Sequence, residues 1–146
     1  MPTTPAPSPR SRDWLARLLA AVTAAYTVVL VLATHYPRPE QFLGTNPPSD
    51  KALHFMAYGA LALLSGGTIA LARRWSAVRA VGLGVLLAAF AAVDEVTQPF
   101  FLRAAEPLDW VFDCVGIGVG LTIVAATVAA VRIARGRYAQ LGVGGR

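Results

Sequence analysis

Four long apolar segments constrain this chain more than any other feature of its sequence. A helix must be about 20 apolar residues long to cross the roughly 30 Å hydrocarbon core of a membrane, because each residue adds about 1.5 Å. The segments approach or exceed this length, and they occupy residues 14–34, 52–72, 77–93 and 110–131. The sequence therefore predicts an all-α fold, an integral membrane bundle of four transmembrane helices.

The composition supports this prediction. The chain has 146 residues, of which 55% are hydrophobic and 14% charged, and it is too apolar for an ordinary soluble domain of this length. A single cysteine, Cys114, excludes both an internal disulfide and a cysteine-cluster zinc site. The first segment is predicted to span rather than to be a cleaved signal peptide, because it is long and is followed by T-H-Y-P-R-P instead of a small-residue cleavage site.

The basic residues predict the orientation. Lys and Arg in short loops stay on the cytoplasmic side, so we expect both termini to be cytoplasmic. Because these residues gather at the ends of apolar segments and not on a solvated face, the net charge of +5 does not predict nucleic-acid binding. Ten of the thirteen basic residues fit this orientation: Arg10, Arg12, Arg17, Arg73, Arg74, Arg79, Arg132, Arg135, Arg137 and Arg146.

The same pattern divides the chain into three parts. Residues 1–13 are rich in Pro, Ser and Thr and are expected to form a disordered cytoplasmic tail, because they cannot bury enough apolar surface to fold. Residues 14–131 form the transmembrane domain. Residues 132–146 are expected to form a basic cytoplasmic tail, and its last ten residues, 137–146, are expected to be disordered.

Acidic residues show the opposite distribution to the basic ones. Seven of the eight carboxylates are predicted on the outer side of the membrane, although acidic residues contribute little to topology. The asymmetry therefore has a cause other than orientation, and it is the first indication of function. The seven are Glu40, Asp50, Asp94, Glu95, Glu106, Asp109 and Asp113.

Three polar groups lie at the predicted outer ends of the helices. Ionisable residues at membrane depth are costly and are usually retained for pairing or for function. Neighbouring helix axes lie about 10 Å apart, so the groups are expected to converge on one shallow, outward-facing pocket. Their members are Asp50, Lys51, His54 and Tyr58 in the first group, Asp94, Glu95 and Gln98 in the second, and Arg103, Asp109 and Asp113 in the third.

Several chemical roles are open to these residues. His54 beside Asp94 or Glu95 would form a general acid–base pair, which makes these three the candidate catalytic residues. Arg103 with Lys51 would hold a phosphate or carboxylate of a lipid headgroup or lipid-linked substrate. The other members of the pocket, Asp50, Tyr58, Gln98, Asp109 and Asp113, are candidate binding residues.

Two further interpretations concern metals and structure. Asp94, Glu95, Asp109 and Asp113 with His54 would form an oxygen-rich site that suits Mg²⁺, Mn²⁺ or Ca²⁺. The sequence has no compact metal motif, however, so neither a metal nor a cofactor is predicted. The structural alternative is a polar seam in which Arg103 pairs with Asp109 or Glu95, His54 bonds a carboxylate, and the network only locks the helices together.

Gly116 and Gly120 form a G-x-x-x-G motif in the fourth segment. Such a motif lets a neighbouring helix approach closely, and packing is its usual role. The Ala-rich third segment is the expected partner within the chain. The same face would also serve a homo-oligomer.

The polar residues resemble those of the VanZ-like membrane protein family. The resemblance rests on D-K-x-x-H-F-x-x-Y from Asp50 to Tyr58, D-E-x-x-Q from Asp94 to Gln98, an Arg at 103, an Asp at 109, and D-C-V-G-I-G-V-G from Asp113 to Gly120. Order and spacing agree over residues 50–120, about half of the chain. The sequence departs from the family in two places: Asp113 stands where the family often has Asn, and Leu102 stands where Gly is common.

The resemblance implies a multipass protein of the bacterial inner membrane that acts at the outer leaflet. The namesake of the family is associated with resistance to teicoplanin, a lipoglycopeptide, and its biochemical activity is not settled. The expected partners are therefore membrane lipids or lipid-linked wall precursors. Whether the protein catalyses a reaction stays open, and the alternative is a non-enzymatic membrane binding or scaffold module whose polar cluster is structural.

Overall fold

The protein consists of four long helices. The computed structural model describes residues 9–37 and 48–143. All four α-helices in these ranges are long and apolar enough to span a membrane, which confirms the predicted all-α bundle. The elements are α1 (Pro9–Thr34), α2 (Asp50–Leu71), α3 (Ala77–Thr97), the short 3-10 helix η2 (Gln98–Phe101) and α4 (Pro107–Val143).

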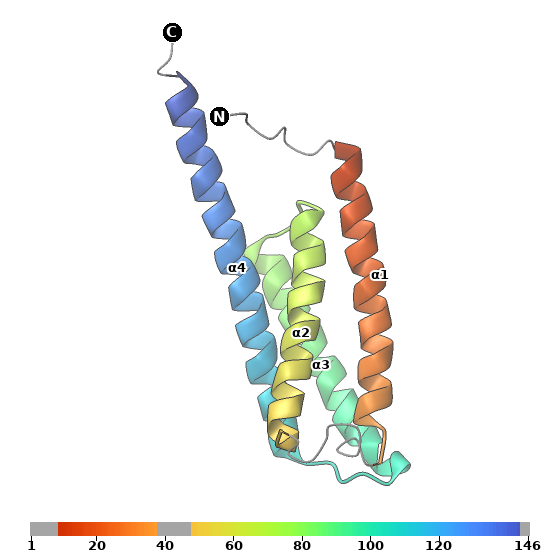
Figure 1. Ribbon diagram of the computed structural model, residues 1–146. Helices are drawn as coiled ribbons and strands as arrows, with labels where there is room; N and C mark the ends of the chain where they lie inside the picture. The colour runs from red at the N-terminus through yellow and green to blue at the C-terminus, as the bar shows by residue number, and fades with distance from the viewer. Residues whose placement is uncertain (1–8, 38–47, 144–146) are drawn as a thin grey trace.

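Consecutive helices run in opposite directions along the bundle (Figure 1). The start of α1 and the end of α4 therefore lie at the same end, as an even number of membrane crossings requires. The other end holds the close of α1, the start of α2, the close of α3 with η2, and the start of α4. We call this the polar end, because it carries the three polar groups predicted from the sequence.

The helices begin and end where the local chemistry favours it. Ser49 caps α2 by accepting a hydrogen bond from the backbone N–H of Ala52 at 3.3 Å. Asp50 then lies in the first turn, where the positive end of the helix favours a carboxylate. The α-helical part of α3 ends at Thr97, two residues before Pro99, which has no backbone N–H to donate.

Both predicted tails are partly helical. α1 begins at Pro9 and α4 continues to Val143, so the expectation of disorder is wrong for residues 9–13 and 137–143. Proline is well tolerated in the first turn of a helix, and Ala, Arg, Gln and Leu extend a helix once it has formed. Residues 1–8 and 144–146 of the predicted tails lie outside the described residues.

Two glycines bring α4 unusually close to α2. A Cβ atom on Gly116 would collide with the carbonyl oxygen of Phe55, and one on Gly120 would lie 2.6 Å from the carbonyl oxygen of Gly59. The helix that packs on the G-x-x-x-G motif is therefore α2. The prediction that the Ala-rich α3 would be its partner is wrong. The reason is that Gly59 and Ala62 give α2 a face of small residues, whose spacing is less obvious than G-x-x-x-G.

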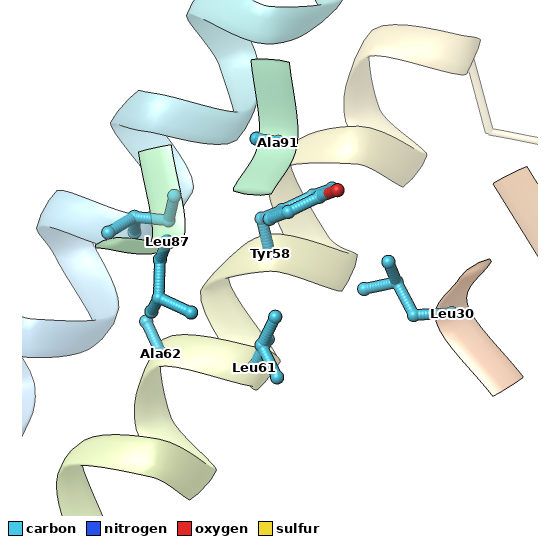
Figure 2. Packing of buried hydrophobic residues seen from close by; sticks show 7 residues of the cluster. Leu30, Tyr58, Leu61, Ala62, Leu87 and Ala91 are labelled. Atoms are coloured by element: carbon cyan, nitrogen blue, oxygen red, sulfur yellow. The ribbon is translucent and has the colours of Figure 1, made fainter. Parts of the chain in front are cut away.

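The apolar core lies just inside the polar end. Leu30 reaches from α1 toward Tyr58 and Leu61 of α2, while Leu87 and Ala91 of α3 close the other side (Figure 2). Tyr58 has no exposed surface and spans the centre of this cluster. The core thus separates the buried polar residues from the rest of the bundle.

The glycine contact makes a prediction about stability. Gly116→Ala forces α4 away from the Phe55 carbonyl, and overpacking of this kind costs about 1–3 kcal/mol of unfolding free energy. Unfolding by sodium dodecyl sulfate in mixed micelles measures the change. Gly118→Ala is the matched control, because an added Cβ at Gly118 meets nothing within 4 Å. Equal stability of the two variants would contradict the packing described here.

Candidate functional site

Among the described residues, seven polar side chains are buried at the polar end of the bundle. They come from α1, α2, α3, η2 and α4, so all the helices contribute to one cluster. Sequence reasoning named six of them, and the structure brings these six together with the other predicted site residues. The seven are Thr34, His54, Asp94, Glu95, Gln98, Asp109 and Asp113.

His54 lies between two aspartates of α4. Its Nδ1 atom is 3.0 Å from Oδ1 of Asp113, and its Nε2 atom is 3.9 Å from Oδ2 of Asp109. The three side chains are at most 3% exposed. The Nδ1 contact is a hydrogen bond, whereas the Nε2 separation is too long for one.

This pairing corrects the predicted one. His54 was expected beside Asp94 or Glu95 of α3, but its carboxylate partners belong to α4. The close approach of α2 and α4 explains the difference. Asp109 and Asp113 lie on the same face of α4 as Gly116 and Gly120, and this face packs on α2.

Asp94 instead contacts the end of α1. The hydroxyl of Thr34 donates a hydrogen bond to Oδ1 of Asp94 at 2.9 Å, and Nδ1 of His35 lies 3.5 Å from the same oxygen. The His35 ring also contacts Thr97, with 2.9 Å between Nε2 and Oγ1. Sequence reasoning missed Thr34 and His35 because it treated T-H-Y only as the boundary of the first span.

Glu95 connects α3 to the segment that precedes α4. Its Oε2 atom accepts a hydrogen bond from Nε2 of Gln98 at 3.1 Å, and its Oε1 atom accepts one from the backbone N–H of Glu106. The Glu106 side chain forms an ion pair with Lys51, with 3.0 Å between Oε2 and Nζ. Lys51 is also 3.7 Å from Oδ1 of Asp109. Glu95 thus holds the start of α4 in place.

Arg103 joins the ends of α1 and α2. Its Nη2 atom donates to Oδ2 of Asp50 at 2.9 Å, and its Nη1 atom donates to the carbonyl oxygen of Thr34 at 3.0 Å. The expected pairing of Arg103 with Asp109 or Glu95 is therefore wrong, because the segment after η2 directs the side chain toward α1 and α2. Leu102 makes this turn with a φ of 61°, in the left-handed region that favours glycine.

The buried cluster carries more polar oxygen than its own hydrogen bonds satisfy. Four carboxylates are buried, and His54 is the only basic residue buried with them among the described residues. An unpaired buried polar atom costs about 1–3 kcal/mol, so a purely structural network would not favour this arrangement. The buried atoms without a hydrogen-bond partner in the described chain are Tyr58 Oη, Asp94 Oδ2, Gln98 Oε1, Asp109 Oδ1 and Asp113 Oδ2.

A hollow of about 490 Å³ lies between α1 and α2 beside this cluster. Its polar lining is concentrated where Asp50, His54, Thr34 and Arg103 meet it, and most of its remaining surface is apolar. Val29 and Leu32 of its α1 wall are exposed on the outside of the bundle. The full lining is Tyr26, Val29, Leu30, Leu32, Ala33, Thr34, Tyr36, Asp50, Leu53, His54, Ala57 and Arg103.

A second hollow, of about 690 Å³, lies at the opposite end of the bundle. Its charged lining residues are Arg73, Arg132 and Arg135, and no carboxylate lines it. Among the described residues, the buried histidine and the buried carboxylates therefore all lie at the polar end.

The fold and the site define a four-helix membrane-embedded protein with a buried histidine and carboxylate cluster at one end. Comparisons of the chain with protein-family models, with curated proteins and with solved structures find no match.

Proposed function

We propose that the protein acts at the outer leaflet of the bacterial cytoplasmic membrane, on cell-envelope lipids or lipid-linked wall precursors. The observation that carries the proposal is the hollow between α1 and α2. Most of its lining is apolar, and its polar lining includes His54, Asp50 and Arg103. An acyl or prenyl chain fits the apolar part, and a headgroup would then lie beside His54, Asp50 and Arg103.

The geometry supports acid–base chemistry on such a headgroup. Asp113 fixes the His54 ring by accepting a hydrogen bond from Nδ1, which leaves Nε2 to exchange a proton. Arg103 uses two of its five N–H groups on Thr34 and Asp50, so it retains donors for a phosphate or carboxylate. In this account His54 is the acid–base residue, Asp113 positions it, and Arg103 binds the anionic group.

Two details are consistent with the VanZ-like resemblance. Leu102 has a positive φ, and glycine, which the family commonly has there, adopts this conformation without strain. The family often has Asn where this chain has Asp113. The side-chain oxygen of Asp113 accepts a hydrogen bond from His54, and the side-chain oxygen of Asn is able to do the same. We therefore extend the association of the family to this chain and propose that it lowers susceptibility to teicoplanin.

Expression in a teicoplanin-sensitive bacterium tests this function. The parent chain is expected to raise the minimal inhibitory concentration, and His54→Gln to abolish the gain, because a general acid–base residue contributes about 100-fold or more to a rate. Membrane abundance is matched by immunoblotting. Asp13→Asn, a change at an exposed carboxylate at the opposite end of the bundle, is the control and keeps the gain. No gain with the parent, or an equal gain with His54→Gln, would contradict the proposal.

A non-enzymatic binding or scaffold module is the second candidate. It is favoured by the ion pairs that join the helices, since Arg103 holds Asp50 and Lys51 holds Glu106. The same assay separates the candidates. A scaffold tolerates His54→Gln as long as the protein remains folded in the membrane, whereas the acid–base account does not.

The proposal requires the polar end to face outward. A fluorescent protein fused after residue 146 is expected to be bright, and alkaline phosphatase fused there to be inactive, because the positive-inside rule places this terminus in the cytoplasm. Insertion of alkaline phosphatase after Pro48 provides the opposite control and is expected to be active. An active phosphatase at the carboxyl terminus would overturn the orientation.

A further inference from the structure

Three residues of the polar end bring possible metal ligands close together. Asp50 and His54 of α2 and Asp109 of α4 each offer a ligand atom, and the three atoms lie within 4.8 Å of one another. His54 and Asp109 are buried, while the side chain of Asp50 is 44% exposed. The site therefore has two fixed ligands from the interior and one ligand at the edge.

The surroundings of His54 supply a second, independent indication. Metal-bound histidines usually donate their other ring N–H to a carboxylate, which fixes the ring and raises its basicity. Asp113 occupies this position, 3.0 Å from Nδ1, so that Nε2 faces Asp109. The 3.9 Å between Nε2 and Oδ2 of Asp109 is too long for a hydrogen bond, and a small movement of either side chain would bring both atoms within reach of one ion at about 2.0–2.2 Å.

Asp109 itself points to a missing positive charge. Its side chain is 2% exposed, and its Oδ1 atom has no hydrogen-bond partner among the described residues. The nearest cation, Lys51, is 3.7 Å from that oxygen and makes its shorter contact with Glu106. A buried carboxylate without full compensation costs several kcal/mol, which a divalent cation at this position would offset.

We propose that Asp50, His54 and Asp109 bind a divalent first-row metal ion, Mn²⁺ or Zn²⁺, with Asp113 as the residue that positions His54. One imidazole nitrogen with two carboxylate oxygens suits these ions better than Mg²⁺ or Ca²⁺, which prefer oxygen ligands alone. Three protein ligands also leave coordination positions open, as in catalytic metal sites.

The metal site rests on the proposed function for its substrate and changes the role of His54. With an ion bound, Nε2 of His54 would be a ligand, and a water on the ion would exchange the proton in its place. Asp50 and His54 both line the hollow between α1 and α2, so open positions on the ion would face a bound headgroup. The cluster is acidic, and an ion at its centre would let it accept the phosphate of a lipid-linked substrate. The substrate class is therefore a lipid-linked phosphate or diphosphate.

Metal binding is measured without any lipid substrate. Full-length protein, free of any histidine tag, is placed in zwitterionic phosphatidylcholine nanodiscs, stripped with a chelator and titrated with Mn²⁺ under electron paramagnetic resonance, or with Zn²⁺ by calorimetry. We expect saturable binding of one ion per chain. Asp109→Asn removes a ligand and Asp113→Ala removes the side chain that positions His54, and each is expected to weaken binding about 10- to 100-fold.

Asp94→Asn is the matched control. It makes the same chemical change in a buried aspartate of the same end, but Asp94 contacts Thr34 and His35 and none of the three ligands. It is expected to bind the ion as the parent does. Circular dichroism confirms that each variant remains helical.

Absence of saturable binding to the parent would overturn the metal site, as would parent-like affinity in Asp109→Asn. Equal loss in Asp94→Asn would show a diffuse acidic cluster and would also overturn it. Failure of the metal site is distinguishable from failure of the proposed function. If the protein lowers teicoplanin susceptibility but binds no metal, the proposed lipid site stands and only the metal site is rejected.

Discussion

The close approach of α2 and α4 determines the rest of the polar end. Gly116 and Gly120 have no side chain where the backbone of α2 passes, so the two helices meet more closely than larger residues would allow. One and two turns earlier on the same face of α4 lie Asp113 and Asp109, which the contact places against His54. A packing motif of small residues thus positions the most polar group in the protein, and a wider helix spacing would separate His54 from both carboxylates.

The free-energy cost of burying charged groups falls at one end of the bundle. Among the described residues, four carboxylates and one histidine are buried there, whereas the charged residues that line the opposite hollow are arginines. Burying charge is unfavourable unless it is fully paired, and Asp109 and Asp113 each retain an oxygen without a hydrogen bond. The apolar layer around Tyr58 confines the cluster to this end. Sites that sacrifice stability in this way usually do so for function.

The sequence predicted the fold better than it predicted the contacts. Segment length and composition sufficed for the four helices, because crossing a membrane imposes a simple length requirement. Helical spacing also placed the polar residues at one end. It did not identify their partners: His54 was assigned to α3 and pairs with α4, and Arg103 pairs with Asp50. Such pairings depend on the rotation of each helix about its axis and on the distance between helices. Both are set by the contact between Gly59 of α2 and Gly116 of α4, which neither segment reveals by itself.

We infer that the buried carboxylates at the polar end are retained for function and not for stability. The most direct test is the melting temperature of Asp109→Asn in nanodiscs with a chelator present. The substitution removes a buried charge and keeps the shape of the side chain. The contacts that it weakens, with Lys51 at 3.7 Å and with His54 at 3.9 Å, are both longer than hydrogen bonds. The account predicts a higher melting temperature than that of the parent, by about 2–4 °C for each kcal/mol gained. A lower melting temperature would contradict it and would make the cluster a structural element of the bundle.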